Sequence, residues 1–229
     1  MLVGQFIINY IKKLIINQHC ISCKSKDTEP YYHICPKCID SLIVMKSLKN
    51  ICPLCHSTWI EKDVCQNCFN KSPLWQNIHT IYSYKNNHIK QLLHLYKFKD
   101  SSLAEHDLIA LIKPHISLFK DYHFIITPCS IPTYKRLGYN PVTRIIQKLD
   151  LEFSESLSKN QQFTTKHLKR QERLQPTTTM VFQAEKINTT KKIVIVDDVF
   201  TTGSTITQAS LALQYHNLMY FDILCFFRS

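Results

Sequence analysis

The hydrophobic pattern from residue 78 onward alternates between strand and helix signals. Some stretches alternate apolar and polar residues or consist of short β-branched runs, as half-buried or buried strands do. In others, apolar residues recur every three or four positions, as on one face of a helix. The predicted strands are 78–84, 122–127, 193–196 and 219–227, and the predicted helices are 86–98, 102–112, 141–149 and 206–215. This alternation indicates an α/β fold with a parallel, doubly wound sheet.

Two further regions carry weaker patterns. Residues 150–192 are polar, and only 178–182 has the character of a strand, while 133–140 is a polar loop. At the N-terminus, residues 1–19 show a helical apolar stripe interrupted by polar side chains. We expect an amphipathic helix that packs on the protein, with peripheral contact to a membrane surface as the alternative.

No stretch of the sequence is apolar for long enough to span a bilayer, so we expect no transmembrane segment. The N-terminal stripe also lacks the early basic region and the small-residue cleavage site of an export signal. We therefore expect a cytoplasmic protein.

Composition adds a preference for anionic partners. The 229 residues carry a formal net charge of +11, which favours nucleic acid or phosphorylated metabolites. The chain has only three glycines, Gly4, Gly138 and Gly203. A glycine inside a turn of so glycine-poor a chain indicates a backbone conformation that other residues do not readily adopt.

Eight of the ten cysteines form Cys-x-x-Cys pairs within residues 20–70. Two intervening residues allow both sulfurs of a tight turn to reach one tetrahedral zinc ion, and two such turns complete its coordination. The predicted ligands of two structural zinc ions are Cys20, Cys23, Cys35, Cys38, Cys52, Cys55, Cys65 and Cys68. Four sulfurs leave no coordination position open for water, so no catalytic role is expected.

The spacing leaves some alternatives open. A disulfide framework would require an oxidising compartment, and the sequence shows no export signal. A redox-active pair would require a thioredoxin-like βαβ pattern beside it, which the sequence lacks. The pairs can also combine consecutively, as two ribbons in tandem, or interleave as a cross-braced module. His19, His33 and His56 lie near the pairs but are not expected to be ligands, and Cys225 is expected to be a buried small hydrophobe.

The segment 193–206 carries the clearest sign of ligand binding. A buried strand runs into Asp197 and Asp198, then into a hydroxyl-rich turn, Thr201, Thr202, Gly203, Ser204 and Thr205, and then into a helix. N–H groups of such a turn and the helix dipole point at an anion. Carboxylates directly before the turn suit sugar hydroxyls, so the order predicts a ribose-5-phosphate site. The alternative is a carboxylate pair that merely caps the helix; no P-loop motif is present.

This segment resembles the phosphoribosyl-diphosphate signature of type I phosphoribosyltransferases. Together with the preceding cysteine pairs, it resembles the ComF family along essentially the whole chain. Lys97-Phe98, Pro128 with Pro132, and the stretch 137–141 resemble further family elements, as do Gln171 and Leu174. The resemblance implies a small N-terminal zinc-ribbon domain, residues 20–70. It also implies a type I phosphoribosyltransferase-like domain, residues 76–229, whose parallel sheet is flanked by helices.

The resemblance also implies roles for the residues. Thr201 to Thr205 would hold the 5′-phosphate, Asp197 and Asp198 the ribose hydroxyls, and magnesium would accompany the phosphoribosyl diphosphate. Thr201 stands where 6-oxopurine enzymes have an aspartate, and a threonine is no general base near neutral pH, which argues against that reaction. Leu137 and Pro141 stand where the family usually has arginine and glutamine. We therefore expect the site to bind phosphoribosyl diphosphate, with catalytic turnover as the weaker expectation.

ComF-type proteins are associated with natural competence, and the resemblance implies that this chain handles incoming single-stranded DNA with DNA-uptake proteins. Two basic clusters are compatible with such a surface: Lys166, His167, Lys169, Arg170 and Arg173, and the aromatic-interleaved Tyr134, Lys135, Arg136 and Tyr139. Either cluster could instead be a solvated face or a pyrophosphate loop. The alternatives for the whole chain are a metabolic phosphoribosyltransferase with an unidentified acceptor and a zinc-ribbon interaction protein whose second domain is inactive.

Overall fold

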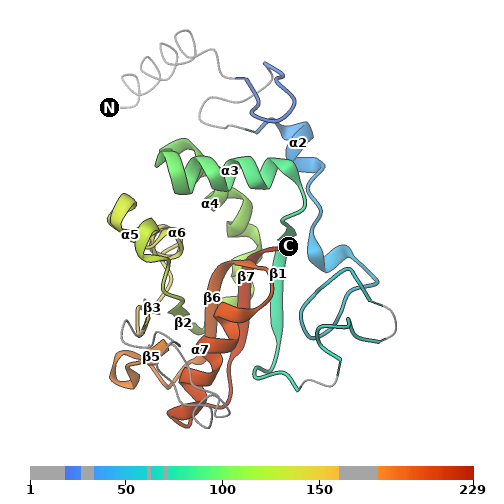
Figure 1. Ribbon diagram of the computed structural model, residues 1–229. Coiled ribbons are helices and arrows are strands. Elements are labelled where there is room, and N and C mark those ends of the chain that lie inside the picture. Colours follow the sequence, from blue (N-terminus) through green and yellow to red (C-terminus); the bar gives the residue numbers. More distant parts are fainter. Residues whose placement is uncertain (1–18, 27–33, 61–62, 70–71, 160–179) are drawn as a thin grey trace.

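The computed structural model describes residues 19–26, 34–60, 63–69, 72–159 and 180–229 (Figure 1). The predicted N-terminal helix, the basic cluster from Lys166 to Arg173, His33, Gln171 and Leu174 lie outside the described residues. None of the described helices combines the length and the apolarity needed to cross a membrane.

The described residues from 78 onward form an α/β unit around a five-stranded parallel sheet with the order β1-β7-β6-β2-β3 (Figure 1). Its strands are β1 (Ile78–Ser83), β2 (Tyr122–Ile126), β3 (Phe153–Ser154), β6 (Lys192–Phe200) and β7 (Asp222–Arg228). A short antiparallel pair, β4 (Leu157–Lys159) with β5 (Met180–Phe182), lies outside this sheet. The predicted parallel α/β sheet is confirmed.

Strand β6 is longer than its sequence pattern suggests. The apolar run ends at Val196, but pairing with β7 continues through Asp197, opposite Cys225, to Phe200, opposite Arg228. The neighbouring strand supplies backbone partners as far as residue 200, so the change from apolar to acidic side chains does not end the strand. The acidic pair therefore lies within the strand itself, near its carboxyl end, where pairing with β7 fixes the backbone.

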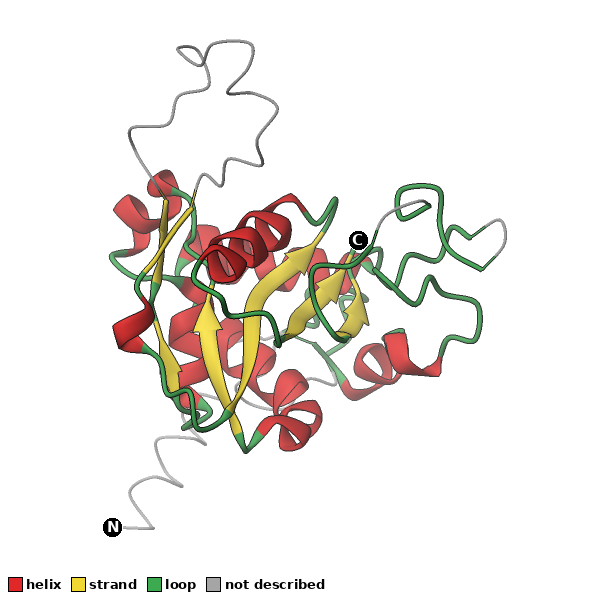
Figure 2. Ribbon diagram, turned by 90° about the horizontal axis from the view of Figure 1, so that it is seen from below, coloured by secondary structure: helices red, strands yellow, loops and turns green. Residues whose placement is uncertain are grey.

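Helices cover both faces of the sheet (Figure 2). The longer ones are α3 (Asn87–Lys99), α4 (Ser102–Ile116), α6 (Pro141–Lys148) and α7 (Ser204–Tyr215). The side chains of Asn86, Ser101 and Asn140 cap α3, α4 and α6 by accepting backbone N–H groups. Short elements are α2 (Pro36–Asp40), α5 (Ile131–Leu137) and the 3₁₀ helices η1 (Met45–Ser47), η2 (Ser117–Phe119) and η5 (Ala184–Lys186).

Alternate residues of the strands face two separate groups of buried side chains. Phe124 and Val194 belong to the group that includes residues of α3, α4 and α6. Ile125 and Ile195 belong to the group that includes α7. The cysteine-rich region is divided in the same way, because Cys20, Cys35 and Cys38 pack with the first group and Cys52, Cys55 and Cys65 with the second.

The prediction of a polar loop over 133–140 is wrong, because most of it is helix α5. Ser130 caps this helix by accepting the N–H of Thr133, and Pro132 supports its first turn. Gly138 ends it in the left-handed conformation, with φ of 77°. The side chains of α5 include no buried residue, so the segment lacks the apolar stripe by which helices are recognised in a sequence.

Candidate functional site

The carboxyl end of β6 leads directly into the predicted phosphate turn. Thr201 and Thr202 follow the strand, Gly203 adopts a left-handed conformation with φ of 80°, and α7 begins at Ser204. A Cβ atom on Gly203 would lie 2.6 Å from the Cζ atom of Phe200, so the packing as well as the backbone requires glycine here. The turn thus presents its backbone at the N-terminus of a twelve-residue helix, where the dipole favours an anion.

Asp197 lies just before this turn in a partly buried setting. Its Oδ1 atom accepts the N–H of Asp198 at 2.9 Å, and the hydroxyl of Thr127 also interacts with it. Burial, and then the charge of neighbouring Asp198, raise the pKa of Asp197 to about 7. A carboxyl group with that pKa can accept or donate a hydrogen bond to a hydroxyl near neutral pH.

Asp198 forms an ion pair with Lys97, which comes from the last turn of α3. Neither side chain is fully buried: 24% of Lys97 and 18% of Asp198 is exposed. In the sequence, Lys97 is recognisable only as part of a family element, and no motif places it in the site. The local sequence around Lys97 shows only a basic residue next to an aromatic one, Phe98, at the end of a helix. The fold brings this cation to the acidic pair across 101 residues of chain.

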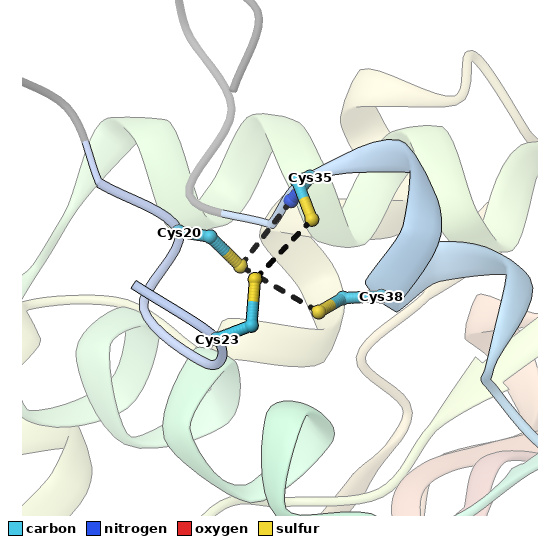
Figure 3. Close-up of side chains that lie close together, drawn as sticks. All are labelled: Cys20, Cys23, Cys35 and Cys38. Atoms are coloured by element: carbon cyan, nitrogen blue, oxygen red, sulfur yellow. Dashed lines mark hydrogen bonds between the residues drawn. The ribbon is translucent and has the colours of Figure 1, made fainter. Parts of the chain in front are cut away.

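The eight predicted zinc ligands gather in two groups. One contains Cys20, Cys23, Cys35 and Cys38 (Figure 3). The other contains Cys52, Cys55, Cys65 and Cys68. In each group all four sulfurs lie within 4.8 Å of one another. The pairs therefore combine consecutively, and the interleaved alternative is excluded.

The sulfur positions fit a tetrahedral metal. Sulfurs of adjacent pairs are separated by 3.7 Å (Cys20 to Cys38), 3.6 Å (Cys23 to Cys35) and 3.5 Å (Cys55 to Cys65). A zinc ion about 2.3 Å from each of four sulfurs would hold them about 3.8 Å apart. Both clusters could therefore hold structural zinc ions through their eight cysteines.

The chemistry of the thiols agrees with that fit. Burial and the neighbouring sulfurs of the first cluster raise the pKa of Cys38 to about 12. Four thiolates so close together need a cation to be stable, and a zinc ion supplies it while displacing the protons. Among the described residues, no third group of at least three His, Cys, Asp or Glu side chains gathers around a common point.

Comparison with known proteins agrees with this combination of parts. No known protein-family profile matches the sequence. The chain is 27% identical over 165 residues to competence protein ComFC of Streptococcus pneumoniae (strain ATCC BAA-255 / R6), which covers 71% of this chain and 74% of that protein. It is 26% identical over 234 residues to competence protein ComFC of Bacillus subtilis (strain 168), covering 89% and 90%. The resemblance to the ComF family is confirmed.

In this ComF-like chain, Arg136 supports the position of Lys97. Its Nη2 atom donates to the carbonyl of Lys97 at 2.8 Å, and its guanidinium lies 4.4 Å from the centre of the Phe98 ring. The neighbouring Tyr139 donates to Asp100 Oδ1 at 2.5 Å. Two members of the predicted basic and aromatic cluster thus tie α5 and the following turn to the end of α3.

A groove beside α3 leads to the ion pair of Lys97 and Asp198. Its volume is about 750 Å³, and its lining comes mainly from the turn of the first cysteine pair and from α3, with Thr133 of α5. The lining contains three lysines and a histidine, two aromatic rings, and no carboxylate: Ile21, Lys24, Tyr84, Lys90, Gln91, Leu93, His94, Leu95, Lys97, Phe98 and Thr133. We call it the α3 groove. Its composition favours a polyanion.

His56 and Cys225, which the sequence places outside the zinc ligands, also have clear surroundings in the structure. His56 lies outside both sulfur groups and shares a hydrogen bond of 2.8 Å with Thr80 Oγ1. Burial lowers its pKa to about 4, so the ring is neutral at physiological pH. Cys225 is fully buried in the sheet, and burial raises its pKa well above the ordinary value, as expected of a small hydrophobe.

Proposed function

We propose that this ComF-like chain binds phosphoribosyl diphosphate at the end of β6 and handles single-stranded DNA in natural competence. The competence role rests on the names of the two relatives. The ligand rests on one observation: an acidic pair at the end of a parallel strand, followed by a left-handed glycine turn at a helix N-terminus. Sites at the carboxyl ends of parallel strands bind ligands in many open α/β sheets.

The residues have distinct roles in this proposal. Backbone amides and hydroxyls from Thr201 to Thr205 hold the 5′-phosphate, and Asp197 and Asp198 hold the ribose hydroxyls. Magnesium enters with the pyrophosphate oxygens of the ligand. Residues 20–70 form the zinc-ribbon domain and 76–229 the ligand-binding domain.

This proposal assigns ligand binding to the site in preference to catalytic turnover. Lys97 already pairs with Asp198, so the ribose hydroxyls compete with or share this contact. No general base replaces Thr201 at the start of the turn. A metabolic transferase with its own acceptor is the alternative, and release of pyrophosphate in the presence of an acceptor would identify it.

Replacing Gly203 by alanine tests the ligand site. We expect magnesium-dependent binding of phosphoribosyl diphosphate by the wild type and at least about a tenfold loss in Gly203→Ala, because a left-handed backbone costs a non-glycine residue about 1–2 kcal/mol and the new Cβ meets Phe200. Titration calorimetry measures both. Gly138→Ala is the matched control, because Gly138 has a similar φ but no atom within 4 Å of its Cβ position. A folded wild type that gives no binding heat would refute the ligand.

Single-stranded DNA is assigned to the α3 groove. Lys24 and Lys90 are exposed along it and can contact phosphates. Phe98 is 52% exposed and stacks on His94, and a base can pack beside this aromatic pair. Lys97 and Phe98 continue this surface to the acidic pair. Bound DNA would therefore lie next to the phosphoribosyl site.

Removing two lysines of the groove tests this assignment. In Lys24→Ala/Lys90→Ala we expect about tenfold weaker binding of a thymidine oligonucleotide and a smaller salt dependence, because each lost phosphate contact lowers the logarithmic slope by about 0.7. Fluorescence anisotropy over a salt series measures both quantities. Lys113→Ala/Lys148→Ala removes the same charge from exposed positions on α4 and α6. Equal losses in both double variants would mean that net charge, and not the groove, determines binding.

A further inference from the structure

Arg228, the last residue of β7, connects the second cysteine cluster to the phosphate turn. Its Nε atom donates to the carbonyl of Cys55 at 2.6 Å. Its Nη1 atom donates to the carbonyls of Phe200 at 3.1 Å and Thr201 at 3.2 Å. The residue is only 8% exposed, so these contacts are shielded from water.

The charge of Arg228 has an unusual partner. Among the ion pairs formed by described residues, none joins Arg228 to a carboxylate side chain, although its Nη1 atom also donates to an oxygen of Ser229. Its Nη2 atom lies 3.7 Å from the Sγ atom of Cys55. A buried guanidinium is costly unless an anion compensates it. Four thiolates around one zinc ion carry a net charge of −2, so the loaded cluster supplies that anion.

The same contacts orient the phosphate turn. The peptide bonds of this described segment are trans, so each carbonyl and the N–H of the next residue point in opposite directions. With the carbonyls of Phe200 and Thr201 both directed at Arg228, the N–H groups of Thr201 and Thr202 are both directed away from it. Successive N–H groups on one side of the backbone form a concave site for an anion.

The second cluster and the turn also share a cavity of about 550 Å³. Cys55 and Cys68 line it from the cluster, and Thr201, Thr202 and Gly203 line it from the turn. The first cluster has a different environment. It packs in the other group of buried side chains, and Ile21 and Lys24 of its first turn line the α3 groove.

We propose that the second cysteine cluster, acting through Arg228, holds the phosphate turn in its binding conformation. Zinc in this cluster and phosphoribosyl diphosphate at the turn then strengthen each other's binding, since coupling between two sites is reciprocal. The first cluster is not coupled to the turn. This inference rests on the proposed function for its ligand, while the ordering of the turn is measurable without any ligand. Arg228 is a positioning residue in this scheme.

Three variants of the full chain test the proposal. Arg228→Gln removes the charge and the forked contacts, Cys68→Ser removes one ligand of the second cluster, and Cys23→Ser removes one ligand of the first. We expect amide hydrogen exchange in residues 200–205 to accelerate at least about fivefold in Arg228→Gln and Cys68→Ser and to stay unchanged in Cys23→Ser. Zinc content, measured in parallel, is expected to stay at two per chain in Arg228→Gln.

Ligand binding adds a second readout. In the wild type, phosphoribosyl diphosphate with magnesium should slow the release of one of the two zinc ions to a chelator at least about fivefold, and Arg228→Gln should remove this effect. Unchanged exchange in all three variants would overturn the inference, as would equal acceleration in Cys23→Ser. If the wild type binds no phosphoribosyl diphosphate but exchange changes as expected, the proposed function fails and the ordering of the turn by the second cluster stands.

Discussion

Asp197→Asn is expected to raise the melting temperature of the protein at pH 8. The same substitution should weaken the binding of phosphoribosyl diphosphate about 10- to 100-fold, which is the range for losing a charged hydrogen-bond partner. The pKa of Asp197 is raised from an ordinary value of 3.8 to about 7. The unfolded chain therefore gives up this proton more readily than the folded one. Folding stability should fall as the pH rises between these two values, and the penalty is complete above about pH 7.

The asparagine removes this penalty but keeps the local geometry, because its amide oxygen can still accept the N–H of Asp198. Its advantage over the wild type should be several degrees larger at pH 8 than at pH 4, where Asp197 is protonated. Thermal unfolding followed by circular dichroism at both pH values measures it.

Asp198→Asn is the matched control, because it changes the same chemical group at the next position. Asp198 pairs with Lys97, so its replacement leaves a cation unpaired and should lower the melting temperature. Both variants should lose ligand affinity. A stabilisation by Asp197→Asn that is equal at both pH values would show that relief of the buried charge is not its cause.

Removal of zinc should have the second large effect. We expect two zinc ions per chain, and stripping them should unfold the cysteine-rich region, because structural zinc in small peptides is worth about 10–16 kcal/mol near pH 7. In the first cluster, the raised pKa of Cys38 means that protons compete with the metal. Its zinc affinity should therefore fall as the pH is lowered.

Metal analysis, chelator titration at several pH values and thermal unfolding check these expectations together. Cys20→Ser and Cys52→Ser should each lower the zinc content to about one per chain, because each removes a fully buried ligand of one cluster. Cys129 lies outside both clusters, so Cys129→Ser should change neither zinc content nor stability. A wild type with one zinc ion or none would contradict the two-site assignment.

The features that depend on local pattern can be predicted from the amino-acid sequence. The β-branched run at the start of β6 predicts a buried strand, and the stripes of α3 and α6 predict helices, because burial on one face needs a fixed period. The Cys-x-x-Cys spacing predicts the sulfur clusters in the same way, since one tight turn brings two sulfurs together. Helix α5 was missed because it lacks such a stripe.

The contacts between distant groups are visible only in the folded chain. The tertiary structure extended β6 beyond the apolar run by pairing Asp197, Val199 and Phe200 with β7, and it combined the cysteine pairs consecutively. It also brought Lys97 to Asp198 and Arg228 to Cys55, partners separated by 101 and 173 residues of chain. No short-range pattern encodes these contacts, because they arise from the order of strands in the sheet and from the face on which each cluster packs.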